Sequence, residues 1–280
     1  MSDILVMGGG KAGSWKIRGE QLGAAIGATV DPLAQRLNGY RLAVLVKHPK
    51  LDSMQRVQRA GIPLVWDIVD AWRIGCDDDA GRETCLSWLR DRAAWLRPAA
   101  IVAATRAMAS DCAAFGVPVL TLPHHARPEQ AVNPIREQVR KVGYDGRVEY
   151  LGWWRGFMDT ECARRGWSFE VNPLQLADLD IVVALREKRG YGATRWKSNV
   201  KLANAQATGT PCILNSEAGY EETASGGEYW ADSPEQMVAA LDALEDVNER
   251  RRRGDALRAK TITLEDAAKT YKTWLAQLNS

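Results

Sequence analysis

The sequence between residues 180 and 214 reads DIVVALREKRGYGATRWKSNVKLANAQATGTPCIL. It starts with an apolar run over 181–185, continues through a basic loop into a helical stretch over 200–208, and ends with a second apolar run over 212–214. Short apolar runs of this kind are typical of buried strands. A strand, a helix and a strand in that order predict a βαβ unit with parallel strands.

The same alternation extends outward in both directions, which predicts an α/β fold with helices on both faces of parallel sheets. The expected strands are 3–7, 42–46, 62–66, 100–103, 118–122, 148–151, 168–171, 181–185 and 212–214. The expected helices are 17–26, a stretch after Asp52, 83–96, 106–115, 156–165, 200–208, 233–246 and 264–278. Ser233 and Gln236 predict a capping box. The run ERRRRG at 249–254 is interpreted as a polar break at a solvated helix end.

A proline-rich segment divides this pattern into two halves. Residues 123–134, PHHARPEQAVNP, contain three prolines and few apolar residues, so we interpret them as a linker. Residues 1–122 and the residues from 135 onward each show their own strand–helix alternation. The prediction is two Rossmann-like domains facing across a cleft, with ligands bound at the carboxyl ends of the strands.

Composition and charge exclude several classes of protein. The 280 residues are 46% hydrophobic and 26% charged, unlike a disordered or membrane-spanning chain. The 37 Lys and Arg against 35 Asp and Glu give a net charge of +2, so the chain is not a polycation. The start MSDILVMGGG lacks the features of a signal peptide, and no apolar run approaches about 18 residues. We therefore expect a cytoplasmic protein without a membrane span.

The cysteines and histidines do not indicate a metal site. The five cysteines are widely spaced and include no C-x-x-C pair, so we expect buried free thiols in a reducing compartment. The three histidines, His48, His124 and His125, lack zinc-finger spacing. No metal is expected.

A glycine loop follows the first expected strand. Gly8, Gly10 and Gly13 fit the pattern G-x-G-x-x-G between a strand and a helix, as in dinucleotide-binding sites. The acid that such sites carry at the end of the second strand is missing, and Lys47 stands there, which leaves NADP as the possible nicotinamide cofactor. Two other interpretations stay open: a ligand that approaches the backbone amides of the loop, and a tight turn without a ligand.

The basic loop over 186–201, REKRGYGATRWKSNVK, holds six basic residues and one acid. It follows the carboxyl end of a strand and leads into a helix that starts near Ser198 or Asn199. Cationic side chains and free helix-start amides would converge there, as in a diphosphate site. A merely solvated loop is the alternative interpretation.

The segment NAQATGTP at 204–211 follows this loop. With the strand at 181–185 and NSEAGYEE at 215–222, it resembles the C-terminal domain of GT-B glycosyltransferases, most like the family 4 group. In that family a helix with an EA-x-A-x-G-x-P segment leads into a strand. GGGKAGSWKIRGEQLG at 8–23 and VWDIVDAW at 65–72 are similar to segments of that family's first domain.

The resemblance implies transfer of a hexosyl or pentosyl group from a nucleotide sugar, expected to be UDP-linked, to an acceptor hydroxyl without a metal. It implies a donor domain over 135–255 and a final helix within 256–280 that packs back on the acceptor domain. The expected donor-binding residues are Gly10, Gly13, Arg186, Lys197, Ser198, Lys201, Asn204 and Glu222. The expected acceptor-binding residues are Ser14, Lys16, Arg18, Trp153 and Trp196, and the expected catalytic residues are Asp67, Asp70 and His124.

The chain also departs from the family pattern. The family's two glutamates, eight positions apart, correspond to Trp196 and Asn204. Asn204 would hold donor hydroxyls through its amide, so the stereochemical outcome stays open. Asp67 or Asp70 is then the candidate general base for an inverting reaction.

The expected acceptor is a 5-hydroxymethylated pyrimidine in double-stranded DNA. Basic clusters at 164–165, 186–201 and 250–253, together with loop tryptophans, suit a polyanion with stackable bases. Small cytoplasmic GT-B-like enzymes that glucosylate such bases in phage DNA are similar in plan. A cell-surface polysaccharide or a small molecule is the alternative acceptor. An NADP-dependent oxidoreductase and a non-catalytic nucleotide-sugar or nucleic-acid binding module are the alternatives to a glycosyltransferase.

Overall fold

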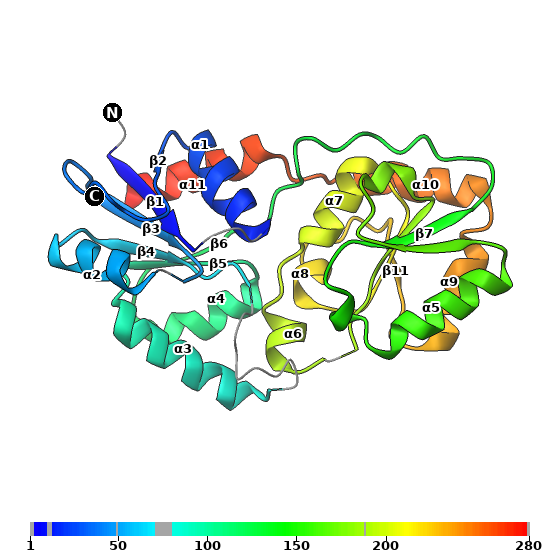
Figure 1. Ribbon diagram of the computed structural model, residues 1–280, viewed down its shortest axis with the longest axis horizontal. Coiled ribbons are helices and arrows are strands. Elements are labelled where there is room, and N and C mark those ends of the chain that lie inside the picture. Colours follow the sequence, from blue (N-terminus) through cyan, green and yellow to red (C-terminus); the bar gives the residue numbers. More distant parts are fainter. Residues whose placement is uncertain (1–2, 10–12, 49, 71–79, 188, 279–280) are drawn as a thin grey trace. The chain divides into compact units, whose positions relative to one another are not determined.

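The computed structural model describes residues 3–9, 13–48, 50–70, 80–187 and 189–278. These residues form two compact units, each assembled from separate parts of the chain (Figure 1). Unit 1 comprises residues 1–125, 190–198 and 263–280, and unit 2 comprises residues 126–189 and 199–262. The nine residues 190–198 therefore belong to unit 1, although the expected domain limits place them within 135–255.

Unit 1 is built on a six-stranded parallel sheet in the order β2-β1-β3-β4-β5-β6. The strands are β1 (Ile4–Gly8), β2 (Thr29–Val30), β3 (Leu42–Val46), β4 (Leu64–Asp67), β5 (Ala100–Ala103) and β6 (Val119–Thr121). The five strands expected in this half are confirmed within two residues at each end, and β2 adds a short edge strand. β3 is buried along its whole length, as expected for a strand with helices on both faces.

Helices cover both faces of this sheet. One face packs against α2 (Leu51–Arg59), α3 (Arg82–Leu96), α4 (Arg106–Cys112) and, from the second half of the sequence, α6 (Tyr191–Arg195) and Trp196. The other face packs against the helical turn η1 (Trp15–Gln21), α1 (Leu22–Ala25) and α11 (Leu264–Gln277). α11 thus packs on unit 1 beside α1, where Ala267, Tyr271 and Leu275 are buried (Figure 1).

Unit 2 is built on a five-stranded parallel sheet in the order β11-β10-β9-β7-β8. The strands are β7 (Lys141–Tyr144), β8 (Ser168–Val171), β9 (Ile181–Ala184), β10 (Cys212–Leu214) and β11 (Tyr229–Trp230). The strand expected at 148–151 is wrong: this stretch is a short 3-10 turn, Val148–Tyr150, and Val148 is exposed. The strand lies seven residues earlier, as β7, where Val142 and Tyr144 are fully buried.

The helices of unit 2 also form two layers. α5 (Trp153–Arg164) and α9 (Pro234–Ala243) pack on one face, and α7 (Val200–Thr208) and α10 (Val247–Arg258) contribute to the core on the other. A short helix, α8 (Ala218–Glu221), follows β10. The side chain of Ser233 accepts from the amide of Gln236 as expected, but Gln236 Oε1 accepts from Asp232, so the reciprocal half of the capping box is not formed.

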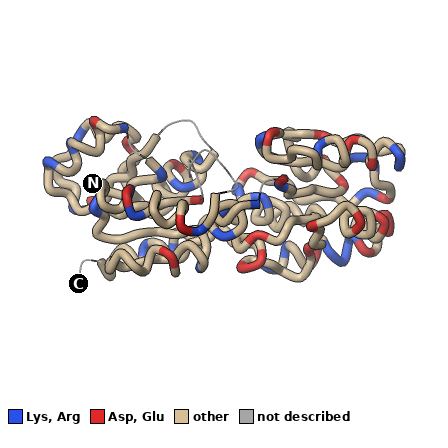
Figure 2. The backbone as a smooth tube through the Cα atoms, turned by 90° about the horizontal axis from the view of Figure 1, so that it is seen from below, with Lys and Arg blue, Asp and Glu red and all other residues tan. Residues whose placement is uncertain are grey.

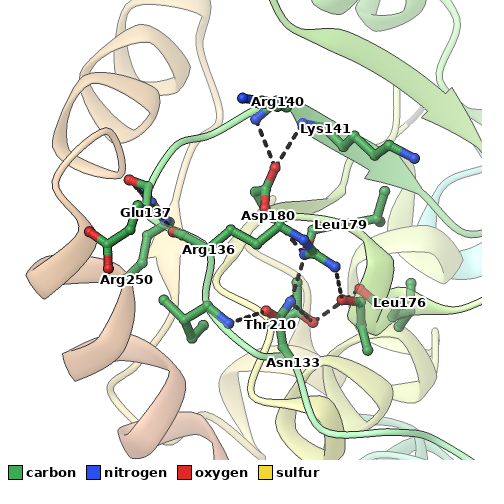
Figure 3. A network of polar contacts seen from close by, with 12 residues as sticks. Asn133, Arg136, Glu137, Arg140, Lys141, Leu176, Leu179, Asp180, Thr210 and Arg250 are labelled. Carbon is green, nitrogen blue, oxygen red and sulfur yellow. Dashed lines mark hydrogen bonds and ion pairs between the residues drawn. The ribbon is translucent and has the colours of Figure 1, made fainter.

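The polar run at 249–254 is not a helix break, contrary to expectation: it lies inside α10. Arg250 is buried within it, and its guanidinium is satisfied by carbonyl oxygens. Nη1 donates to Leu244 and Glu245 at 2.6 and 2.8 Å, and Nη2 donates to Arg136 and Glu137 at 2.7 and 3.1 Å. Because these four carbonyls belong to the end of α9 and to the segment before β7, Arg250 joins three parts of unit 2 (Figure 3).

The segment before β7 is fixed by a second set of buried polar contacts (Figure 3). Asp180 Oδ2 accepts from the amides of Arg140 and Lys141 at 2.7 and 2.9 Å, and Asp180 Oδ1 pairs with Arg136 at 3.3 Å. Asn133 donates to Thr210 Oγ1 at 2.9 Å and to the Leu179 carbonyl at 2.7 Å. These contacts set where β7 begins.

Among the described residues, no helix is both long and apolar enough to cross a membrane. The four described cysteines, Cys85, Cys112, Cys162 and Cys212, are buried and free. Cys85 and Cys112 lie in unit 1 and the other two in unit 2. Burial raises the pKa of each thiol, to about 12 for Cys112 and Cys162.

Candidate functional site

The glycine loop of unit 1 is packed by a tryptophan. A Cβ atom on Gly8 would lie 2.8 Å from the Trp15 ring and 2.8 Å from the Val46 carbonyl oxygen, and one on Gly19 would lie 2.5 Å from the same ring. Trp15 is buried, and its indole donates to Glu20 at 3.0 Å. The structure therefore explains Gly8 and Gly19 by packing. Gly13 is exposed with open space around it, and Gly10 lies outside the described residues.

Two strained residues follow neighbouring strands at the carboxyl edge of this sheet. Lys47 after β3 has φ of 61°, and its carbonyl accepts from the Trp66 indole at 2.9 Å. Val69 after β4 has φ of 71° and forms the centre of a three-residue turn, in which the amide of Asp70 donates to the Ile68 carbonyl at 2.9 Å. Such turns are rare and strained, and strain of this kind clusters at functional sites.

The side chains of Lys47 and Asp70 form an ion pair beside these strained residues. Lys47 Nζ lies 2.8 Å from Asp70 Oδ1, and both side chains are about one-fifth exposed. Lys47 is thus engaged with a carboxylate, which makes it a poor partner for the 2′-phosphate of NADP. Asp70 is the more accessible of the two expected carboxylates at this edge.

Asp67, the last residue of β4, is buried beside Arg18. Its Oδ2 lies 3.8 Å from Arg18 Nε, and both side chains are almost fully buried. Burial raises the pKa of the Asp67 carboxyl, and the Arg18 guanidinium partly offsets that rise. Arg18 donates to the Leu122 carbonyl, whereas its Nε and Nη1 have no hydrogen bond among the described residues. This edge therefore holds a buried carboxylate that is more basic than an ordinary aspartate, beside a guanidinium with unused donors.

His124 and His125 lie at the end of the part of unit 1 that precedes unit 2. Both are buried, and His125 Nε2 contacts Gln21 Oε1 at 3.1 Å. Burial and the charge of Arg18 hold the pKa of His124 well below its usual value of 6.5. His124 is therefore neutral at pH 7, and it accepts a proton only at a pH well below 6.5.

The structure does not place all expected acceptor residues on the surface. Lys16 is exposed and Ser14 is half-buried, but Arg18 is buried. Trp196 does not lie on the surface as expected. It is fully buried in the core of unit 1, and its indole donates to Asp111 at 2.8 Å. Its ring is not available to stack on an acceptor.

In unit 2, Arg186 lies just after the carboxyl end of β9 and contacts residues of three other segments. Its Nε donates to Glu217 Oε1 at 3.1 Å, its backbone amide donates to Asn215 Oδ1 at 2.6 Å, and its guanidinium lies 4.6 Å from the centre of the Tyr150 ring. Arg186 and Glu217 are both buried. The guanidinium is thereby held in one orientation, and part of its charge is balanced by Glu217.

Lys201, in the first turn of α7, lies at the same sheet edge because β7 and β9 are parallel neighbours. Its Nζ donates to the Tyr144 hydroxyl at 3.0 Å and lies 4.3 Å from the centre of that ring. Arg186 and Glu217 both act on the pKa of Tyr144, which burial raises. The edge thus gathers two cations over two tyrosine rings, a chemistry suited to phosphate and ribose groups.

The other expected donor residues divide between the two units. Asn204 in α7 is buried, and its Oδ1 accepts from the Arg127 amide at 3.1 Å, while Nδ2 has no hydrogen bond among the described residues. Glu222 is half-buried after α8. Lys197 and Ser198 are buried and belong to unit 1, whereas Arg186, Lys201, Asn204 and Glu222 belong to unit 2.

Sequence reasoning missed Glu217, Tyr144 and Tyr150 at this edge. The polar residues directly after the strand at 212–214 were the signal for Glu217, because a strand's carboxyl end is where ligands bind in such sheets. Tyr144 and Tyr150 are missed because the apolar pattern predicts a strand at 148–151 instead of at β7.

Trp153, one of the expected acceptor-binding residues, lies at the start of α5 in unit 2 and is exposed. Its side chain is 47% exposed, and its ring stacks on Trp154 at 4.1 Å between centroids. Its amide donates to Glu187 Oε1 at 3.3 Å. The exposed indole is therefore held in place and offers a face for stacking.

The expected basic clusters are largely paired with acids. Arg164 and Arg165 both contact Glu161, and Arg165 also contacts Asp242 and Glu245. Three arginines of α10 pair with acids: Arg251 with Glu137, and Arg252 and Arg253 with Glu249. Figure 2 shows basic and acidic residues interspersed along both units. Within the described parts of the chain, no group of three or more His, Cys, Asp and Glu side chains is placed to hold a metal.

Comparison with known proteins adds evidence on the fold. No family model matches the sequence, and no curated protein sequence is similar to it. Among solved structures, HepE from Anabaena in complex with UDP and glucose is similar with a TM-score of 0.69 and 11% identity over 98% of this chain and 99% of that one. Sucrose-phosphate synthase from Thermosynechococcus elongatus is similar with a TM-score of 0.68 and 12% identity over 99% of both chains.

A third similar structure is the lipopolysaccharide outer core galactosyltransferase WaaB, with a TM-score of 0.58 and 8% identity over 98% of this chain and 99% of that one. At such identities the similarity establishes the architecture rather than the activity. The chain therefore has the GT-B fold, an α/β architecture of two Rossmann-like units that each carry a parallel sheet.

Proposed function

We propose that this protein is a glycosyltransferase that moves a sugar from a UDP-linked donor to an acceptor hydroxyl. The carrying observation is the cluster of Arg186, Lys201, Tyr144 and Tyr150 at the carboxyl edge of the unit 2 sheet. Two oriented cations can bind a diphosphate and stabilise charge on a leaving nucleotide. The similar HepE structure contains UDP and glucose, which supports a UDP-linked donor.

The donor proposal assigns different tasks to the cluster. Lys201 provides a point charge for the diphosphate, and Arg186 provides directed donors whose orientation Glu217 and Tyr150 fix. Lys197 and Ser198, directly before α7, and Glu222 complete the proposed donor contacts. Asn204 contributes its Nδ2 as a donor to a hydroxyl oxygen, because its Oδ1 is occupied by the Arg127 amide. No metal is part of this proposal.

Calorimetric titration with UDP and UDP-glucose tests donor binding, with GDP-, ADP- and CMP-linked sugars and NADP as competing ligands. Hydrogen bonds to charged groups contribute about 1.5–3 kcal/mol each. The Lys197→Ala and Lys201→Ala double variant should therefore lose at least about tenfold in UDP affinity. Lys141→Ala is the matched control, because Lys141 begins β7 at the opposite edge of the same sheet. Unchanged UDP affinity in the double variant would refute this donor site, and binding of NADP alone would favour an oxidoreductase.

We propose Asp67 as the general base that takes the proton of the acceptor hydroxyl as its oxygen attacks the sugar carbon and the bond to UDP breaks. Its raised pKa makes it a stronger base than an ordinary aspartate, and Asp70 and His124 lie on the same unit as the alternatives. Asp67→Asn should lower kcat about 10²–10⁴-fold while UDP affinity stays at the wild-type value. If Asp70→Asn or His124→Asn shows that loss and Asp67→Asn does not, the base is assigned to the wrong residue.

The acceptor proposal is a hydroxyl group on a saccharide or a small molecule, with 5-hydroxymethylated pyrimidine in DNA as the second candidate. The arginines at 164–165 and 251–253 pair with acids of the fold, which removes much of the support for a polyanion. Exposed Trp153 still offers a stacking surface for a base or a sugar ring. Transfer of radiolabelled sugar to hydroxymethylated DNA, to unmodified DNA and to a panel of oligosaccharides decides between the two. Label in hydroxymethylated DNA alone would restore the DNA acceptor.

A further inference from the structure

Within unit 2, Arg127 connects two residues at the carboxyl edge of the sheet. Its guanidinium Nη2 lies 3.2 Å from Asp145 Oδ2, and its backbone amide donates to Asn204 Oδ1 at 3.1 Å. Asp145 directly follows β7, whereas Asn204 lies in α7, and all three residues belong to unit 2. Because both contact one arginine, Asp145 and Asn204 lie close together although they are far apart in the sequence.

Lys201 lies beside the same pair of residues. Lys201 and Asn204 are three positions apart in α7, so their side chains lie on the same face of that helix. A Cβ atom on Gly146, the residue directly after Asp145, would lie 3.0 Å from Lys201 Nζ. The cation proposed for the diphosphate and the Asp145 carboxylate therefore occupy neighbouring positions at this edge.

The hydrogen-bonding capacity of this group of residues is incompletely used within the chain. Asn204 is 1% exposed, and its Nδ2 makes no hydrogen bond among the described residues. Because a buried donor without a partner is costly, this amide calls for an oxygen atom from outside the chain. The side chain of Asp145 is 23% exposed, so a bound molecule can reach its carboxylate.

An amide donor and a carboxylate acceptor side by side match the needs of hydroxyl groups. Each hydroxyl has one hydrogen to donate and an oxygen that accepts. Asn204 Nδ2 can serve only the oxygen, so a hydroxyl bound there still needs an acceptor for its hydrogen. Asp145 supplies that acceptor, and its negative charge strengthens the hydrogen bond.

We propose that Asp145 and Asn204 together recognise vicinal hydroxyl groups of the donor: the Asp145 carboxylate accepts a hydroxyl hydrogen, and Asn204 Nδ2 donates to a hydroxyl oxygen. The proposal rests on the donor site proposed above and adds an acid to it. Vicinal hydroxyls adjoin the diphosphate of a sugar nucleotide on both sides, on the ribose and on a transferred sugar such as glucose. The two sources share one chemistry, and the choice of ligands below distinguishes them.

The test measures the affinities of UDP, 2′,3′-dideoxy-UDP and UDP-glucose by calorimetry, for the full-length wild type and for Asp145→Ala. If the ribose is bound, the variant should bind UDP and UDP-glucose about tenfold more weakly, with 2′,3′-dideoxy-UDP unchanged. If the transferred glucose is bound, only UDP-glucose should lose this factor. Either result supports the proposal and identifies which hydroxyls Asp145 contacts.

The comparison among ligands separates recognition from structural damage. A general disturbance of unit 2 in Asp145→Ala would weaken all three ligands by the same factor, and this result would overturn the proposal, as would three unchanged affinities. If Asp145→Ala does not fold, Asp145→Asn serves instead. Its amide oxygen still accepts a hydrogen bond but without charge, so the same ligands should weaken by about threefold.

Glu170→Ala is the matched control. Glu170 lies in β8 of the same unit and also forms an ion pair of 3.2 Å, with Lys141, so its loss should change none of the affinities by more than about twofold. A wild type that binds neither UDP nor UDP-glucose would refute the donor site and this proposal with it. A wild type that binds UDP, with ligand selectivity unchanged in Asp145→Ala, would refute this proposal alone.

Discussion

At the carboxyl edge of the unit 1 sheet, single residues have a protonation equilibrium or a backbone conformation that an isolated residue would disfavour. Asp67 is buried with a raised pKa, and Lys47 and Val69 occupy the left-handed region of backbone conformation. Each of these features costs free energy that the surrounding packing must supply. Their concentration after β3 and β4 is the reason that this edge is the candidate for the chemistry of the acceptor.

His124 allows a prediction on the pH dependence of stability. Its pKa is lowered in the folded protein, so the unfolded chain binds a proton below about pH 6.5 that the folded chain does not bind. Stability should therefore fall as the pH drops below about 6.5, by at most about 1.4 kcal/mol per pH unit. Urea denaturation between pH 7.5 and 5 should show a steeper loss for the wild type than for His124→Asn.

Asp67 contributes with the opposite sign to this pH profile. Its raised pKa means that the folded protein retains a proton that the unfolded chain has released, so acidification stabilises the fold through this group. The comparison of His124→Asn with the wild type keeps Asp67 in both proteins. Parallel slopes in the two proteins would show that His124 does not resist protonation in the fold.

At the scale of elements, Arg250 joins α10 to the end of α9 and to the segment before β7. Replacing it with lysine keeps the charge but removes the fork that reaches four carbonyl oxygens. Arg250→Lys should lower the free energy of unfolding by about 3 kcal/mol, because hydrogen bonds to charged groups contribute about 1.5–3 kcal/mol each. Arg251→Lys, on the exposed side of the same helix turn, should change it by less than about 0.5 kcal/mol. Equal effects in the two variants, measured by urea denaturation, would contradict this role.

Some elements of the fold can be predicted from local sequence, and others cannot. Strands such as β3 and β9 were predicted because they are buried on both faces and carry uninterrupted apolar runs. β7 was missed because Gly143 interrupts its short apolar pattern, and its start is fixed by Asp180, 39 residues away. The charge run in α10 looks like a solvated break in the sequence, because no local pattern shows that Arg250 is buried against backbone carbonyls of other elements.

Local sequence likewise predicts some residues of the candidate site and misplaces others. Arg186 and Lys201 were identified from their place after a strand and before a helix, which local sequence reveals. The polar neighbours of Trp196 predict a surface residue, whereas its buried indole donates to Asp111, 85 residues away. Contacts over such separations follow from tertiary packing within unit 1 and leave no local pattern.

At the scale of the whole molecule, the two units differ in how much of the chain they need. Unit 2 is continuous over 126–262 except for the nine residues 190–198, whereas unit 1 needs its first 125 residues, Trp196 and α11. A fragment of residues 126–262 should therefore fold alone and give a dispersed amide NMR spectrum. A fragment of residues 1–125 should give a collapsed spectrum, because one sheet face lacks its cover by α11. A dispersed spectrum for 1–125 would show that α11 and Trp196 are dispensable.

The buried cysteines make the folding of each unit separately measurable. Two of them lie in each unit, and their raised pKa values and lack of exposure keep the thiols unreactive while the surrounding unit stays closed. In protein with Cys76 replaced by serine, a short pulse of an alkylating reagent would label only molecules in which a unit has opened. Mass analysis of the four peptides would then give two opening rates from one sample, and would reveal whether a bound nucleotide slows the opening of one unit or of both.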